Sequence, residues 1–192
     1  GGRVIMINFK GQVWIETVLY TLIGLALIGV VLAIITPKIN EARDRIVVEQ
    51  TIESLNILDS KISDVANRGS GNIRIIPAYT IKKGELYINS TSDEIFFVIS
   101  GLKSLYSENG VEIDIGKVRV LSTEGQKTHT TVLTLEYGGM ANITYDKKEE
   151  VKKFSPASTP YKFSIENLGN AGNNLFAIDI VVNKFHRAWA VE

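Results

Sequence analysis

The chain of 192 residues contains no cysteine and only two histidines, His129 and His186. Without cysteine there can be no disulfide framework and no thiolate chemistry. Both histidines are predicted to be surface residues, and no GxSxG, P-loop, HExxH or GxGxxG pattern occurs in a suitable context. The sequence therefore predicts a protein that is not an enzyme and that holds no metal and no cofactor.

The chain also has no excess of positive or negative charge, because its 21 basic side chains balance its 21 acidic ones. Zero net charge gives no support for a nucleic-acid surface, so we expect no nucleic-acid partner. The length fits one domain of moderate size beside any helical extension. Such a domain, lacking disulfides, must be held by its own hydrophobic core.

What the chain does have is a long uncharged run. Residues 17–36 carry no charged side chain and consist mostly of Val, Leu, Ile and Ala. About 20 helical residues cross a hydrocarbon core of about 30 Å, and a soluble helix is seldom uncharged on all sides for that distance. The sequence therefore predicts a transmembrane segment at 17–36.

Beyond Pro37 the pattern becomes periodic, with apolar residues at steps of three and four that indicate an amphipathic helix. These residues are Ile39, Ala42, Ile46, Val48, Ile52, Leu55, Leu58, Ile62 and Val65. Charged residues, among them Asp44 and Asp59, are predicted to occupy the other faces. We expect a kink at Pro37, continuation through it, and an end near Asn67, before the glycines at 69 and 71. The apolar stripe packs on its own domain, contacts neighbouring subunits, or does both along different turns.

From residue 72 onward, short β-branched and aromatic segments alternate with turn signals. Three hairpins are predicted: 78–81 with 85–88, 117–122 with 130–137 continued by 141–145, and 161–166 with 175–182 across the Gly/Asn-rich loop 167–174. A further strand is expected at 94–99, a short helical turn at 102–107, a solvated edge or loop at 147–153, and a last strand or contact patch at 185–191. The fold class is therefore α+β, a long N-terminal helix followed by an antiparallel β-sandwich or curved-sheet domain.

The residues before the apolar run carry a family resemblance. The leader that ends with Lys10 and Gly11 is too short and not apolar enough for an ordinary secretory signal. Gln12 follows it, and Glu16 is the fifth residue counted from Gln12. With the span, the amphipathic extension and the β-domain, this order resembles an archaeal type IV pilin with a class III signal peptide. Five residues precede Met6, so either translation starts at Met6 or the chain comes from a longer frame.

The resemblance implies a processing and assembly pathway. A prepilin peptidase would cut between Gly11 and Gln12, removing leader 1–11 and leaving helix 12–68 and an extracellular β-rich domain at 72–192. The protein would first span the cytoplasmic membrane once, in contact with lipid and with its leader in the cytoplasm. A pilus assembly platform would then build it into a homo-oligomeric filament on the cell surface, with the helices bundled at the centre.

Glu16 has two readings. A carboxylate near the membrane boundary reaches water or favours the helix N-terminus. The resemblance implies instead that it pairs with the new N-terminal amine of Gln12 in a neighbouring subunit. In the same run, Gly24 and Gly29 would permit close helix contact, although their spacing is not GxxxG.

Two sequons, Asn89-Ser90-Thr91 and Asn142-Ile143-Thr144, are candidate N-glycosylation sites next to predicted turns.

Three functions stay open: a structural subunit of a filament for adhesion or surface attachment; a minor pilin or pseudopilin of a secretion or assembly system; and a non-polymerising single-span surface binding protein. A surface enzyme ranks fourth.

Overall fold

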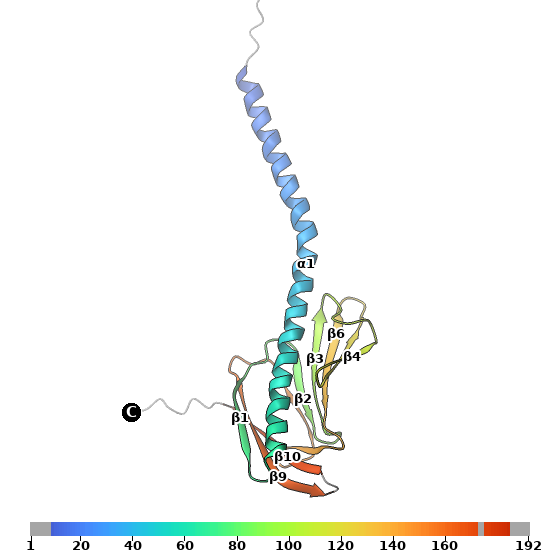
Figure 1. The fold of residues 1–192 in the computed structure, drawn as a ribbon. Coiled ribbons are helices and arrows are strands. Elements are labelled where there is room, and N and C mark those ends of the chain that lie inside the picture. The colour runs from blue at the N-terminus through green and yellow to red at the C-terminus, as the bar shows by residue number, and fades with distance from the viewer. Residues whose placement is uncertain (1–8, 173–174, 185–192) are drawn as a thin grey trace, which may run out of the picture. The chain divides into compact units, whose positions relative to one another are not determined.

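The computed structural model describes the backbone of residues 9–172 and 175–184 (Figure 1). It is an α+β protein, with one long N-terminal helix followed by two β-sheets, which confirms the predicted fold class. The chain divides into two compact units, Gly1–Ala42 and Arg43–Glu192. The first unit contains the apolar half of the helix, and the second contains its amphipathic half together with both sheets.

Helix α1 runs without interruption from Phe9 to Asn67, with Pro37 inside it. The predicted continuation through Pro37 and the predicted end at Asn67 are confirmed, whereas the helix begins three residues before Gln12. Asparagine side chains satisfy two carbonyl oxygens at the end of the helix, one in its last turn and one on the residue that follows it. The Nδ2 atom of Asn167 donates to the Val65 carbonyl at 3.0 Å, and that of Asn72 donates to the Arg68 carbonyl at 2.8 Å. These bonds replace helical partners that no longer exist at a C-terminus.

Ten strands follow within the described residues and form two open sheets. The four-stranded sheet has the order β1 (Ile73–Tyr79), β9 (Tyr161–Gly172), β10 (Leu175–Lys184) and β7 (Ala141–Tyr145). The six-stranded sheet has the order β4 (Glu112–Ile115), β5 (Val118–Thr123), β6 (His129–Glu136), β3 (Glu94–Leu102), β2 (Glu85–Asn89) and β8 (Val151–Phe154). Neighbouring strands are antiparallel except β10 and β7, which are parallel.

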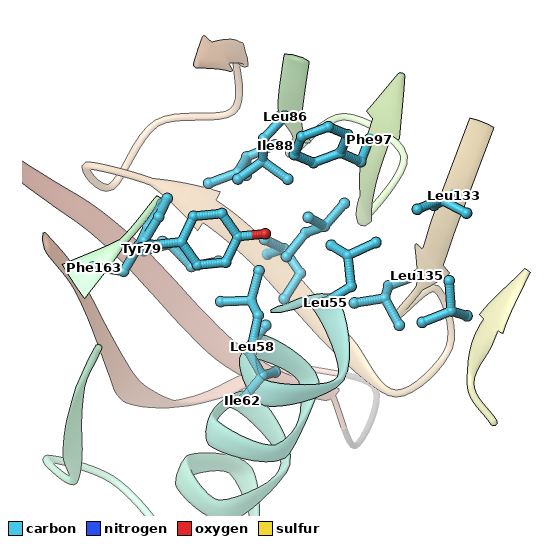
Figure 2. Close-up of a cluster of buried hydrophobic side chains, with 14 of the residues drawn as sticks. Leu55, Leu58, Ile62, Tyr79, Leu86, Ile88, Phe97, Leu133, Leu135 and Phe163 are labelled. Atoms are coloured by element: carbon cyan, nitrogen blue, oxygen red, sulfur yellow. The ribbon is translucent and has the colours of Figure 1, made fainter. Parts of the chain in front are cut away.

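The amphipathic half of α1 and both sheets share one hydrophobic core (Figure 2). Leu55, Leu58 and Ile62 on the helix are fully buried. They pack among Tyr79 and Phe163 from the four-stranded sheet and Leu86, Ile88, Phe97, Leu133 and Leu135 from the six-stranded sheet. The predicted packing of the apolar stripe on its own domain is therefore confirmed, while its contact with other subunits stays a prediction.

The first predicted hairpin is wrong, because its two strands belong to different sheets. β1 pairs with β9, whereas β2 pairs with β3 and β8. Tyr79 and Ile81 are both buried, so the connection from β1 to β2 crosses the edge of the core from one sheet to the other and does not form a hairpin turn. Gly84 completes the crossing at φ 88°, where a Cβ atom would lie 2.5 Å from the Val98 carbonyl oxygen. Glycine is required there by the close approach to β3, and the turn-like sequence does not mark a hairpin.

The hairpin of β5 and β6 is confirmed, but its predicted continuation into 141–145 is wrong. After Tyr137 the chain leaves the six-stranded sheet, and β7 pairs in parallel with β10. The third hairpin, β9 with β10, is also confirmed. Its predicted loop is largely strand, since β9 extends to Gly172 with Asn167 and Asn170 accepting bonds from the amides of Gly169 and Gly172, both at 2.8 Å.

The predicted strand at 94–99 is confirmed as part of β3, but no helical turn follows it. The segment is irregular, and its amides at Lys103 and Ser104 donate to the Asp44 carboxylate of α1. The charge-rich 147–153 segment leads into β8, an edge strand, as predicted. The predicted strand or patch at 185–191 lies outside the described residues.

Candidate functional site

The apolar half of α1 is the first candidate site. By length and composition it is apolar enough to cross a membrane, and none of its most apolar stretch is buried within the protein. Every large apolar side chain from Val18 to Ile35 is at least 40% exposed. Each such side chain gains about 1.5–3 kcal/mol on leaving water, so this surface requires lipid or other protein around it.

The polar groups of this segment are compatible with an apolar surrounding. The hydroxyls of Thr17, Thr21 and Thr36 donate to the carbonyl oxygens four residues earlier, at 2.9, 2.8 and 2.6 Å. Such bonds satisfy a hydroxyl without water. A Cβ atom added at Gly24 or Gly29 would meet no atom within 4 Å, so neither glycine is required by contacts inside this chain. Their predicted role in contacts between helices stays a prediction.

The structure places the predicted cleavage and assembly residues in the first turns of α1. The backbone of Lys10, Gly11 and Gln12 is helical, and their side chains lie outside the described part of the structure. Glu16 is exposed, one helical turn beyond Gln12. Within the described residues the Glu16 carboxylate has no hydrogen-bond or ion-pair partner, which leaves it available to another molecule.

The two sequons have different surroundings. Asn89 ends β2 at a turn, its side-chain oxygen accepts a bond from the Thr91 amide at 3.2 Å, and Thr91 is exposed. Asn142 lies inside β7, and the hydroxyl of its sequon partner Thr144 is 2.7 Å from a carboxylate oxygen of buried Asp179. The Asn89 sequon therefore runs from the end of a strand into a turn and ends at exposed Thr91, whereas the Asn142 sequon lies inside a strand.

Two aspartates that sequence reasoning assigned to the exposed faces of the helix are buried, which corrects that prediction. Asp44 is 8% exposed and Asp59 is 9% exposed. Asp59 accepts a hydrogen bond from the Tyr137 hydroxyl at 3.1 Å and pairs with the Lys117 ammonium at 3.3 Å. Asp44 binds the backbone amides beyond β3 and lies 3.5 Å from the Lys83 ammonium.

These aspartates fix the amphipathic half of α1 to the six-stranded sheet. A carboxylate that is withdrawn from water is tolerated only with such partners. Burial and the nearby Asp59 carboxylate raise the pKa of Tyr137 well above its ordinary value of 10.0, which keeps its hydroxyl protonated and donating. No sequence signal near Asp59 marks its role, because Tyr137 is 78 residues away along the chain.

A groove of about 460 Å³ lies between α1 and the connection from β1 to β2. Its walls include Gln50, Glu53 and Ser54 from the helix and Lys82 and Lys83 from the connection. The groove is widely open and mixes charges of both signs. It offers contact to a polar molecule but no enclosed, dry site for chemistry.

The histidines do not form a site. His129 begins β6 and is half-buried, with its Nδ1 atom lacking a partner, so the prediction of a surface histidine holds only in part. His186 lies outside the described residues. In the part of the chain that the structure describes, no group of three His, Asp or Glu side chains is arranged to hold a metal ion.

Comparison of the chain with protein families, with characterised proteins and with solved structures finds no match.

Proposed function

We propose that the chain is the structural subunit of an archaeal type IV pilus-like surface filament that serves adhesion or surface attachment. One observation supports this most strongly: an exposed apolar helix continues, within the single element α1, into the buried core helix of a β-domain. A filament subunit needs both properties in one helix. The apolar half can leave lipid for a bundle of like helices, while the amphipathic half carries the domain.

In this proposal a prepilin peptidase cuts between Gly11 and Gln12, and an assembly platform draws the processed helix from the cytoplasmic membrane into the filament. The exposed Glu16 would pair its carboxylate with the amine of Gln12 in a neighbouring subunit, because a charge this near lipid is costly without a partner. The domain then lies outside the cell. No enzymatic role and no nucleic-acid partner form part of the proposal.

The proposal is tested by expressing the gene in an archaeal host that carries a prepilin peptidase. Sheared surface filaments are collected, imaged by electron microscopy, and identified by mass spectrometry. Filaments built mainly of this chain support the structural role. Filaments that contain the chain only in trace amounts would favour a minor pilin or pseudopilin instead.

The groove beside α1 favours a second candidate, a single-span surface protein that binds a polar solute and does not polymerise. This candidate requires the same membrane helix but neither cleavage nor filaments. An uncleaved protein that stays in the membrane and binds a solute would favour it over the filament subunit.

A further inference from the structure

Five basic residues gather where α1 enters the domain unit. Arg43 and Arg45 flank Asp44 in the sequence, and the Lys83 ammonium lies 3.5 Å from the Asp44 carboxylate. The same carboxylate accepts the Lys103 amide, and Lys82 precedes Lys83 on the connection from β1 to β2. We call these residues the basic collar: Arg43, Arg45, Lys82, Lys83 and Lys103.

The acidic groups around the basic collar do not balance it. Asp44 is buried and pairs with Lys83, and Glu49 pairs with Arg45 at 2.9 Å. Arg43, Lys82 and Lys103 are exposed and have no acidic partner within 4 Å among the described residues. Glu53, on the wall of the groove that includes Lys82 and Lys83, offsets one of these charges. The basic collar therefore presents surplus positive charge to its surroundings.

The positions of Arg43 and Arg45 along the chain bring these two residues of the basic collar close to a membrane surface. Arg43 follows Thr36, the last residue of the uncharged run, by seven residues, which is about 10 Å at the helical rise. The polar headgroup region adds about 5–7 Å beyond the hydrocarbon on each side of a bilayer. Long basic side chains bridge the remaining distance, since they extend their charged ends toward a polar boundary.

We propose that the basic collar docks the domain on anionic lipid headgroups while the protein is still a membrane-anchored monomer. This inference rests on the membrane anchoring that is part of the proposed function. Lipid phosphates are the ligand because they lie within reach of residues 43–45 before any other subunit arrives. Each basic side chain near an anionic surface raises the equilibrium constant for docking about fivefold. Entry into a filament would then require release of these contacts.

The absence of cysteine makes a direct test possible. The full chain carrying Thr80→Cys, an exposed position two residues before Lys82, is labelled with a fluorescent donor and reconstituted into vesicles with an acceptor on the headgroups. Vesicles contain phosphatidylcholine alone or mixed with phosphatidylglycerol. Energy transfer should be greater in the mixed vesicles, and high salt should remove the difference because it screens exposed charges.

Matched variants identify the residues responsible. Arg43→Gln, Lys82→Gln and Lys103→Gln together should lower the equilibrium constant for docking by about two orders of magnitude in mixed vesicles. Lys127→Gln, Lys147→Gln and Lys148→Gln remove the same charge from exposed positions elsewhere and should leave energy transfer unchanged.

Three results would overturn the inference. Suppose the protein co-floats with both vesicle types, which shows that it is anchored, and energy transfer is equal in both. Docking on anionic lipid is then rejected, while the membrane anchor stands. Failure to float with either vesicle type removes the anchor itself and the docking with it. If the collar variant retains lipid-dependent transfer but loses cross-links between subunits, the basic collar is a contact between copies of the chain and not a lipid site.

Discussion

The hydroxyl of Tyr137 donates a hydrogen bond to the buried carboxylate of Asp59, across 3.1 Å, and thereby ties helix α1 to the six-stranded sheet. Tyr137 is 1% exposed, so its hydroxyl has no access to bulk water. Lys117 completes the arrangement from the start of β5. The helix and the residue that follows β6 are therefore joined by a hydrogen bond to a buried carboxylate.

Removing the Asp59 carboxylate should destabilise the domain unit. In Asp59→Ala the Tyr137 hydroxyl stays buried without an acceptor, and we expect a loss of about 2–4 kcal/mol in the free energy of unfolding. Chemical denaturation of the full chain in detergent measures this loss. Glu53→Ala, an exposed change on the same helix, should stay within about 0.5 kcal/mol of the native chain. Equal stability of the two variants would show that the Tyr137 contact contributes little.

The buried tyrosines predict a loss of stability at high pH. Burial raises the pKa of Tyr79 and of Tyr137 above their ordinary value of 10.0, and for Tyr137 the Asp59 charge adds to this. Above about pH 10 the unfolded chain releases these protons while the folded chain keeps them. Unfolding is then favoured by about 1.4 kcal/mol per pH unit for each tyrosine.

This dependence is measured by chemical denaturation at a series of pH values from neutral to strongly alkaline. The contribution of both tyrosines is fully present below pH 10 and declines above it. The slope above pH 10 should fall in Tyr137→Phe and fall further when Tyr79→Phe is added. A double variant with the native slope would assign the alkaline transition to other groups.

The structure ranks the two sequons. If the protein is glycosylated, the glycan should be on Asn89, because its sequon leaves the strand end and its Thr91 is exposed, and not on Asn142, whose Thr144 hydroxyl is engaged by Asp179. Mass spectrometry of the mature protein should show that Asn89→Gln removes the added mass and that Asn142→Gln retains it. The reverse pattern would mean that attachment occurs before β7 folds.

Glu16→Ala should separate membrane insertion from assembly. The variant keeps the uncharged run and the cleavage residues, so we expect a protein that is inserted and processed normally. Because the charge that pairs with Gln12 is gone, filaments counted by electron microscopy should be several times fewer. Glu16→Asp keeps a carboxylate and serves as the control. Normal filament numbers in Glu16→Ala would remove the proposed pairing.

Local patterns in the sequence predict the elements whose causes are local. The uncharged run predicts the apolar helix, the three- and four-residue spacing predicts its amphipathic half, and turn residues predict the β5–β6 and β9–β10 hairpins. The exchange of sheets between β1 and β2 is not predictable in this way, because Lys82, Lys83 and Gly84 resemble a hairpin turn. The crossing depends on pairing with distant strands, β1 with β9 and β2 with β3 and β8, which no local pattern encodes.

The buried aspartates were missed for a related reason. A charged residue in an amphipathic pattern indicates an exposed position unless its partner is known. The partners of Asp44 and Asp59 come from strands and loops that begin about 40 to 80 residues later in the chain. The reverse holds for Glu16 and the leader, which are prominent in the sequence. Their proposed roles, pairing and cleavage, require a neighbouring subunit and a peptidase, which a single chain does not contain.

The mass and terminal sequence of the mature protein distinguish a processed filament subunit from an uncleaved membrane protein. Protein recovered from the membrane and from sheared filaments of an archaeal host is analysed by mass spectrometry. A filament subunit should yield a mature chain that begins at Gln12, with residues 1–11 removed. A chain that begins at Met6 or earlier in both fractions would contradict the proposed processing, because no free amine at Gln12 would exist to pair with Glu16.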